Sequence, residues 1–303
     1  MALRNGWPDP ILGGHYPFED RSFQLADGTS MHYIEMGSSG FRRPTLLLLH
    51  GNPTWSFLWR RFLAPLSRHA RVVAVDHVGF GRSDHPDDWR YHTLDRHIAN
   101  LEELSAGLGL KRVIPVVQDW GGPIGLGWAT RHSDELAGLA VLNTWSFTRR
   151  VPVRLPLAYR ALRTPGIAEL ALRRANVLVE QALPRLLKER PTPEVMAAYR
   201  HPFPTAASRA ALVAMPRMVP VKPGDSGWET LDRIEKALPS LDVPARIVWG
   251  AHDPVFSKKF AWAFSEALPK AGKPVFLDGA GHFLQEDAPE PIIEEISALV
   301  KGL

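Results

Sequence analysis

Short runs of apolar residues, each closed by glycine, aspartate or histidine, recur through the first half of the chain. They cover residues 45–51, 71–79, 112–122 and 136–143, and stretches with helical spacing separate them. Continuous apolar runs of this kind are typical of strands that are buried on both faces of a parallel sheet. The pattern therefore predicts an α/β fold with a mostly parallel central sheet flanked by helices.

Two further regions extend the predicted sheet. Residues 22–37 alternate between polar and apolar side chains around Asp27-Gly28, which predicts an antiparallel hairpin. Late in the chain, residues 245–253 and 273–282 have the composition of strands, and a helical segment at 258–269 separates them. We expect the second of these strands to end at His282.

The strand pattern disappears between Thr148 and about residue 238. Apolar residues at three- and four-residue spacing, most clearly at 167–183, predict helices that prolines interrupt. We interpret residues 1–147 and 236–303 as an α/β core and residues 148–235 as an inserted helical cap. Such a cap would lie over the carboxyl ends of the strands, where open α/β sheets bind their ligands.

Composition and charge narrow the class of protein. The 303 residues include no cysteine, which excludes disulfides, thiolate metal sites and cysteine nucleophiles. Of the net charge of +4, residues 149–235 hold 15 basic and 8 acidic side chains, against 21 and 24 elsewhere. Because this segment has no docking motif, we interpret the charge as solvated helix faces and expect no nucleic-acid partner. No apolar run approaches a membrane span of about 20 residues and no signal peptide is evident, so we expect a cytoplasmic protein.

The segment around Asp119 is the first candidate for chemistry. It predicts a strand, a tight turn and a helix, with glycines two and three residues after Asp119. In this arrangement a turn at the carboxyl edge of an α/β sheet exposes a nucleophile. An ordinary turn with an N-cap aspartate has the same local pattern, so this segment alone leaves both interpretations open.

Three other strand ends favour the nucleophile. His50-Gly51-Asn52-Pro53 closes the first parallel strand, where a backbone N–H of Asn52 can build an oxyanion hole with that of Trp120. The strands near the C-terminus lead to Asp253 and His282. The order Asp119, Asp253, His282 is the nucleophile, acid and histidine order of the α/β-hydrolase triad.

Five segments resemble the haloalkane dehalogenases of the α/β-hydrolase superfamily, and the resemblance covers nearly the whole chain. Its most specific feature is Asn52 after His-Gly together with Trp120 after Asp119. The segments are HGNPTWSFLWR (50–60), DHVGFGRSD (76–84), VVQDWGGPIG (116–125), AYRHPFP (198–204) and GAGHFLQED (279–287).

The resemblance implies hydrolysis of haloalkanes to a primary alcohol, halide and a proton, with no cofactor and no metal. Asp119 would displace the halide and form an alkyl ester, which water activated by His282 would hydrolyse, with Asp253 orienting the histidine. Asn52 and Trp120 would bind the halide through side-chain N–H groups and hold the oxyanion through backbone N–H groups. The expected partners are a small apolar halogenated substrate and the halide ion.

The resemblance is closest to the third dehalogenase subgroup. Asn143 occupies the place where one subgroup has a triad Glu, and the cap has no tryptophan before Trp228 to serve as a second halide donor, as it does in another subgroup. The third subgroup is associated with self-association, so a homo-oligomer is one expectation. Candidate walls of the substrate pocket are the residues Trp145, Phe147, Phe203 and Leu284.

Alternatives remain open at this point. An epoxide hydrolase would use the same Asp119 together with two cap tyrosines, for which Tyr159 and Tyr199 are available. Two further alternatives are a binding protein that kept the fold but lost the chemistry, and a cofactor-free oxygenase. The intact set of strand-end residues disfavours both. His92 and His97 have no third ligand at metal-binding spacing, and we expect them at the surface.

Overall fold

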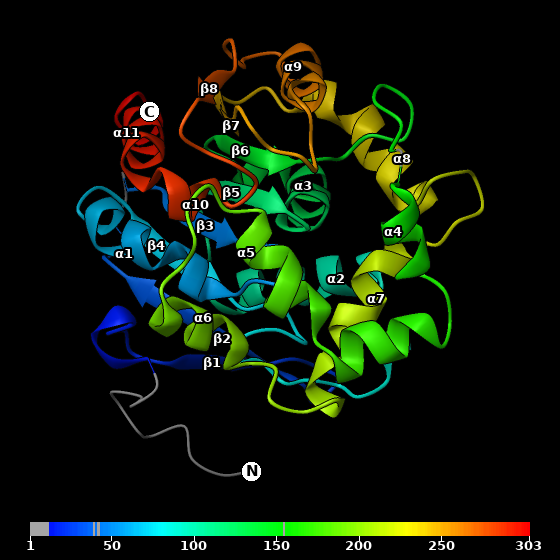
Figure 1. The fold of residues 1–303 in the computed structure, drawn as a ribbon. Helices are drawn as coiled ribbons and strands as arrows, with labels where there is room; N and C mark the ends of the chain where they lie inside the picture. The colour runs from blue at the N-terminus through cyan, green and yellow to red at the C-terminus, as the bar shows by residue number, and fades with distance from the viewer. Residues whose placement is uncertain (1–11, 39, 41–42, 154) are drawn as a thin grey trace.

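An eight-stranded sheet forms the centre of the molecule (Figure 1). The computed structural model describes residues 12–303 apart from residues 39, 41–42 and 154, so most of the N-terminal stretch considered for a signal peptide lies outside the described residues. The strands run in the spatial order β1-β2-β4-β3-β5-β6-β7-β8. Their bounds are β1 (Arg21–Gln24), β2 (Ser30–Met36), β3 (Thr45–Leu49), β4 (Arg71–Val75), β5 (Val113–Asp119), β6 (Leu139–Thr144), β7 (Ala245–Gly250) and β8 (Val275–Leu277).

The pairing of the strands confirms the predicted fold class. β1 and β2 form the antiparallel hairpin around Asp27-Gly28, and β2 also pairs antiparallel with β4. Every other pair is parallel. All residues of β3, β5 and β6 are buried, as expected for strands that are covered on both faces. The carboxyl ends of β3, β5, β6 and β7 therefore meet at one edge of the sheet.

Helices cover both faces of this sheet. On one face α1 packs against α11, and on the other α3 packs against α2 and α8 (Figure 1). α3 begins directly after the turn at Asp119, which fixes the direction in which the chain leaves β5. The helices outside the insertion are α1 (Arg60–Ser67), α2 (Leu94–Gly107), α3 (Gly121–Arg131), α8 (Trp228–Ala237), α9 (Lys258–Ala267), α10 (Leu284–Asp287) and α11 (Pro289–Lys301), with short 3₁₀ segments η1 (Gly13–His15), η2 (Ser56–Trp59), η3 (Trp89–Tyr91), η4 (Ser133–Glu135) and η8 (Leu238–Ser240).

The chain between β6 and α8 folds mainly as short helices. The helical periodicity at 167–183 becomes two π-helical segments, because Asn176 between them has a left-handed φ of 51° that breaks the regular hydrogen bonding. α8 crosses the expected cap boundary at residue 235 and packs on α3. The elements are α4 (Leu157–Ala161), η5 (Glu169–Arg174), η6 (Leu178–Ala182), α5 (Leu183–Arg185), α6 (Pro193–Arg200), η7 (Ala207–Arg209) and α7 (Ala210–Met218).

A buried ion pair ties the helical insertion to the sheet. Arg60 of α1 binds Glu286 of α10, and only 6% and 8% of their side chains are exposed. Tyr199 of α6 donates its hydroxyl to the same Glu286 carboxylate. Trp55 Nε1 also donates to the carbonyl of Ala198, at 3.1 Å. Separating a buried carboxylate from several charge-assisted partners costs free energy, so these contacts hold α6 in a fixed place.

The last strand is shorter than expected. The prediction that it ends at His282 is wrong, since β8 stops at Leu277 and Ala280 N then donates to the Leu277 carbonyl in a turn. The chain at Gly250 also approaches the Gly281 carbonyl so closely that a Cβ there would overlap it. His282 therefore lies in a loop beyond the sheet edge, and its position depends on contacts other than strand pairing.

Four histidine rings are buried together beside the loop after β4. The ring centroids of His50 and His77 are 4.6 Å apart, those of His77 and His97 5.9 Å, and those of His97 and His92 5.4 Å. The expectation that His92 and His97 lie at the surface is wrong, because only 2% and 1% of these residues are exposed. His97 lies on the buried side of α2 and stacks on His92, which follows η3 and contacts the backbone at Gly79.

These imidazoles are held in the neutral form. Burial lowers the pKa of His50, His77 and His97 and brings the pKa of His92 to about 4. Among the described residues, neither ring nitrogen of His77 has a hydrogen-bond partner, so nothing there stabilises an added proton.

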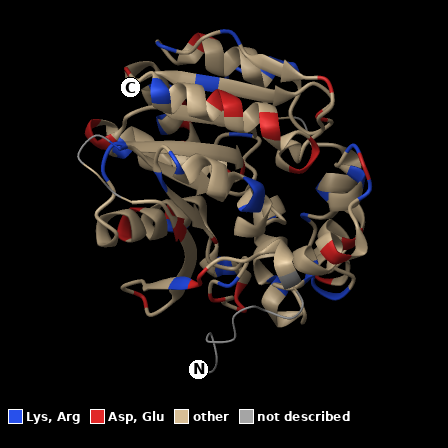
Figure 2. Cartoon of the chain, turned by 90° about the vertical axis from the view of Figure 1, so that its left-hand side faces the viewer, with Lys and Arg blue, Asp and Glu red and all other residues tan. Residues whose placement is uncertain are grey.

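The charged residues are distributed over many elements. Figure 2 shows Lys and Arg interspersed with Asp and Glu along the chain. Within the insertion, basic side chains form ion pairs between Arg173 and Asp87, Arg200 and Glu180, and Arg217 and Glu169. No helix among the described residues is long and apolar enough to cross a membrane.

The buried histidines predict acid sensitivity of the fold. Unfolded histidine binds a proton near pH 6.5, whereas folded His77 does so only at a much lower pH. The unfolded state therefore binds more protons, and the free energy of unfolding falls as the pH drops below about 6.5. We expect His77→Leu to reduce this slope by up to about 1.4 kcal/mol per pH unit in urea unfolding curves between pH 4.5 and 7.

The exposed His69 provides the matched control for this experiment. His69→Gln should leave the slope unchanged. An equal slope in wild type and His77→Leu would contradict the prediction.

Candidate active site

Asp119 ends β5 at the centre of the carboxyl edge. It has a left-handed φ of 47°, which is unusual for a residue other than glycine and turns its side chain out of the strand. Its carbonyl accepts a hydrogen bond from Thr144 Oγ1 on the adjacent strand β6. A Cβ at Gly122 would overlap Thr144, so the small residue there permits the close approach of α3 to β6. The local geometry is that of a strand, a sharp turn and a helix, as the sequence predicts.

The loop after β3 supplies backbone donors to this carboxylate. Asn52 N donates to Asp119 Oδ1 at 2.8 Å, and the backbone N–H of Trp120 also bonds to the Asp119 side chain. A Cβ at Gly51 would overlap the Asp119 side chain, so only glycine lets this loop come close enough. The two N–H groups expected to form an oxyanion hole thus converge on one carboxylate.

His282 faces the other oxygen of Asp119. Its Nε2 lies 3.8 Å from Asp119 Oδ2, and its Nδ1 lies 3.1 Å from Asp253 Oδ2. The second oxygen of Asp253 accepts the backbone N–H of Val255 at 2.7 Å, which fixes the carboxylate. The structure therefore brings Asp119, His282 and Asp253 together, although they come from the end of β5, the loop after β8 and the loop after β7.

The charges of Asp119, His282 and Asp253 influence the pKa values of Asp119 and His282. Burial raises the pKa of Asp119 above the usual carboxyl range, although the positive charge of His282 and the two backbone N–H groups act against this. Burial by itself would lower the pKa of His282, but the charge and hydrogen bond of Asp253, together with the charge of Asp119, raise it above 6.5. Asp119 thus contributes to holding a proton on His282.

Three neighbours hold the backbone around His282. Asn143 Nδ2 donates to the carbonyls of Gly281 and His282 at 2.7 and 3.1 Å, and its Oδ1 accepts the N–H of Gly250. Gln118 Nε2 donates to the His282 carbonyl at 3.3 Å. The N–H of His282 donates to the carbonyl of Leu186 in the helical insertion, at 3.1 Å.

The sequence reasoning missed this support. In the sequence, Asn143 stands where one dehalogenase subgroup has a triad Glu, and this position indicates no contact with the His282 backbone. Amide side chains at the ends of neighbouring parallel strands were the available signal for Asn143 and Gln118. No sequence pattern indicates Leu186, because its contact depends on how the insertion docks.

The side chains expected to bind halide are buried at the same place. Trp120 is 3% exposed. The Oδ1 of Asn52 has no partner among the described residues. Trp145 packs edge-on against Trp120, with ring centroids 4.8 Å apart, and its buried Nε1 also lacks a partner there. The buried N–H of Trp145 is therefore an uncommitted donor beside Trp120 that a ligand could use.

The four candidate pocket residues are all buried. Trp145 stacks on Phe256, whose ring lies 5.6 Å from that of His282. Phe147 packs on Phe264 of α9. Two further candidates are buried, Phe203 beside Phe80 and Leu284 at the start of α10. Of the four, Trp145 has the direct ring contact with Trp120.

The two tyrosines of the insertion differ in their surroundings. The Tyr199 hydroxyl is committed to Glu286. Burial and the negative charge of Asp119 raise the pKa of Tyr159 well above its ordinary value, so this tyrosine stays protonated. Among the described residues, no cluster of three or more His, Cys, Asp or Glu side chains could hold a metal ion.

Comparisons with known proteins agree with this architecture. Residues 44–289 match the family described as the alpha/beta hydrolase fold. The chain is 36% identical to haloalkane dehalogenase 2 of Mycobacterium tuberculosis, over 95% of this chain and 96% of that protein. It is 33% identical to a cis-3-alkyl-4-alkyloxetan-2-one decarboxylase of Xanthomonas campestris, over 94% and 97% of the two chains.

Solved structures show the same fold. The haloalkane dehalogenase DbeA from Bradyrhizobium elkani superposes with a TM-score of 0.84 at 30% identity, over 94% of this chain and 98% of that chain. The DBJA delta mutant superposes with a TM-score of 0.84 at 33% identity, over the same shares of the two chains. The fold, the sheet order and these relatives together establish that the chain belongs to the α/β-hydrolase family, among its haloalkane dehalogenase-like members.

Proposed function

We propose that this protein hydrolyses the carbon–halogen bond of haloalkanes to give a primary alcohol, a halide ion and a proton. The main support for the proposal is that the two oxygens of Asp119 have different contacts. Oδ1 is held by the backbone N–H of Asn52 at 2.8 Å, while Oδ2 faces His282 at 3.8 Å. One oxygen is thus restrained by the oxyanion donors, and the other is free to attack carbon.

In the first step Asp119 Oδ2 attacks the carbon that carries the halogen. The new C–O bond forms as the C–halogen bond breaks, and the electron pair of that bond leaves with the halide. The indole N–H of Trp120 and the amide N–H of Asn52 would stabilise the departing anion. Neutral donors suit this task, because a fixed positive charge would retain the product halide.

In the second step His282 takes a proton from water, and the hydroxide attacks the ester carbonyl of Asp119. The electron pair moves to Oδ1, which the backbone N–H of Asn52 already contacts, and the backbone N–H of Trp120 would be the second donor. Collapse of this oxyanion breaks the bond between the former carboxylate carbon and the alkyl oxygen; the alkoxide takes one proton of the attacking water to leave as the alcohol, and the other proton passes from His282 to solvent. Asp253 stabilises the imidazolium form and keeps the ring oriented.

Ester formation prepares the histidine for this role. In the free enzyme the charge of Asp119 is one of the influences that raise the pKa of His282. Alkylation neutralises Asp119, which lowers the pKa of His282 and favours the neutral imidazole that acts as base.

We further propose that residues 148–235 act as the cap over this site. We also propose that the protein belongs to the third dehalogenase subgroup, with Asp253 as the triad acid.

Strained oxygen rings are the second class of substrate to consider. A relative of this chain is an oxetanone decarboxylase, and Tyr159 stays protonated near Asp119. An epoxide hydrolase with two tyrosine donors has less support, because the hydroxyl of Tyr199 is occupied by Glu286. Parallel assays with an epoxide and a cis-dialkyl oxetanone separate these activities from dehalogenation.

Bromide release tests the leading proposal. We expect turnover of short bromoalkanes such as 1-bromobutane, and a loss on the order of 10⁴-fold in Asp119→Ala, because the nucleophile is gone. Ion chromatography of released bromide measures it. Absence of bromide from a panel of primary bromoalkanes with the wild-type protein would refute the proposed function.

The histidine variant should trap the intermediate. His282→Gln can still form the ester but lacks the base that activates water, so an alkyl-enzyme adduct accumulates. Intact-protein mass spectrometry should show the mass of one added alkyl group. The double variant Asp119→Asn, His282→Gln is the control without adduct, and normal turnover in His282→Gln would contradict the role of the histidine.

The triad acid Asp253 should set the pH dependence of ester hydrolysis. The rate should rise with pH as His282 loses its proton and level off above the pKa that His282 has in the ester, where Asp253 alone raises it. Asp253→Asn removes the group that raises this pKa most, so the midpoint should move about one pH unit or more to lower pH. Single-turnover decay of the alkyl-enzyme from pH 4.5 to 9 measures it.

Asp134→Asn, in the exposed segment η4, is the control and should keep the wild-type midpoint. If Asp253→Asn and the wild type share one midpoint, Asp253 is not the acid that faces His282 during the reaction.

A further inference from the structure

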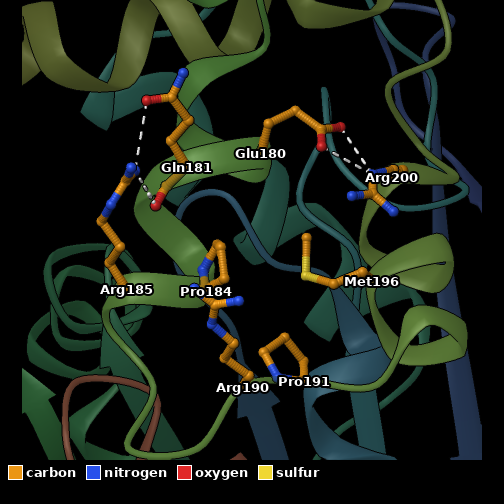
Figure 3. Close-up of a pocket in the computed structure, with 8 residues that line it drawn as sticks. All are labelled: Glu180, Gln181, Pro184, Arg185, Arg190, Pro191, Met196 and Arg200. Atoms are coloured by element: carbon orange, nitrogen blue, oxygen red, sulfur yellow. Dashed lines mark hydrogen bonds and ion pairs between the residues drawn. The ribbon is translucent and has the colours of Figure 1, made fainter.

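A second concave site lies in the helical insertion, outside the constellation around Asp119. It is a pocket of about 330 Å³ formed by η6, α5, α6 and the loop between α5 and α6. This volume is at the lower end of the range for small-molecule sites. The residues that line it are Glu180, Gln181, Pro184, Arg185, Arg190, Pro191, Met196 and Arg200 (Figure 3).

The pocket carries an excess of positive charge. Arg200 is neutralised by Glu180, since its Nε lies 2.9 Å from each carboxylate oxygen. Arg185 bonds only the uncharged oxygens of Gln181, at 2.8 and 3.4 Å. Arg190 is exposed, and no hydrogen bond or ion pair joins it to another described residue. Two of the three guanidinium groups therefore lack a counter-charge.

Arg190 is placed to meet a ligand. In Figure 3 its side chain reaches from the loop toward Pro184 in the middle of the group, and no interaction is drawn to it. Arg185 and Arg200 lie nearer the rim, each tied to its own partner. A guanidinium group presents a planar fork of donors that matches the two oxygens of a carboxylate.

The wall also has an apolar part. Pro184, Pro191 and Met196 supply it beside the polar Glu180 and Gln181, and Met196 is buried. A doubly charged phosphate would need more donors than one free fork and would gain little from prolines and methionine. A monoanion with a hydrocarbon tail satisfies both the charge and the apolar surface.

We propose that this pocket binds a small carboxylate that bears a short alkyl tail. The proposal does not depend on the reaction at Asp119, because it concerns binding at separate residues. The site is nonetheless joined to that centre through the backbone. Leu186, next to Arg185, accepts the N–H of His282 at 3.1 Å, so an occupant would contact the segment that holds the histidine.

Calorimetric titration of the full-length protein with hexanoate tests the proposal. We expect one saturable site in the wild type, and no binding of 1-hexanol or sodium chloride at the same concentrations. Arg190→Gln should weaken hexanoate binding roughly tenfold or more, because it removes the guanidinium group that pairs with the carboxylate. Arg185→Gln should cause a smaller loss.

Arg174→Gln is the matched control, since Arg174 is an exposed arginine of the same insertion outside the pocket. It should retain the wild-type affinity, and all variants should keep the wild-type Tm. Equal losses in Arg190→Gln and Arg174→Gln would overturn the proposal. So would binding of 1-hexanol as tight as that of hexanoate, or full competition by inorganic phosphate.

Discussion

The structure depends on the requirement to keep a carboxylate at the buried end of a strand. Asp119 is 7% exposed, and its charge has to be balanced by donors that the fold itself provides. A left-handed backbone turn aims the side chain, and backbone N–H groups of Asn52 and Trp120 reach it. The parallel order β3, β5, β6 makes this convergence possible, because it brings the carboxyl ends of these strands side by side.

The partner of that carboxylate has less support from the sheet itself. His282 lies five residues after the end of β8, and amide side chains and the Leu186 carbonyl hold its backbone. The buried Arg60 and Glu286 pair fixes α6 nearby through Tyr199. Core and insertion therefore position the histidine jointly. A change in how the insertion docks on the core would change the position of His282.

Charge in the insertion has two different environments. Arg173, Arg200 and Arg217 are paired with acidic residues. Arg190 differs because it lines a pocket and has no ion-pair partner among the described residues. The sequence count of basic residues could not separate these cases, since pairing depends on which residues of other elements lie nearby.

The sequence by itself determined the α/β alternation, the hairpin, the turn at Asp119 and the order of the candidate residues. These follow from local periodicity and from residues whose chemistry is distinctive. Tertiary structure alone decided the short β8, the burial of His92 and His97, and the support of His282 by Asn143 and Leu186. Those features arise from contacts between segments far apart in the chain, and no local pattern encodes which distant surface a loop or a polar side chain will meet.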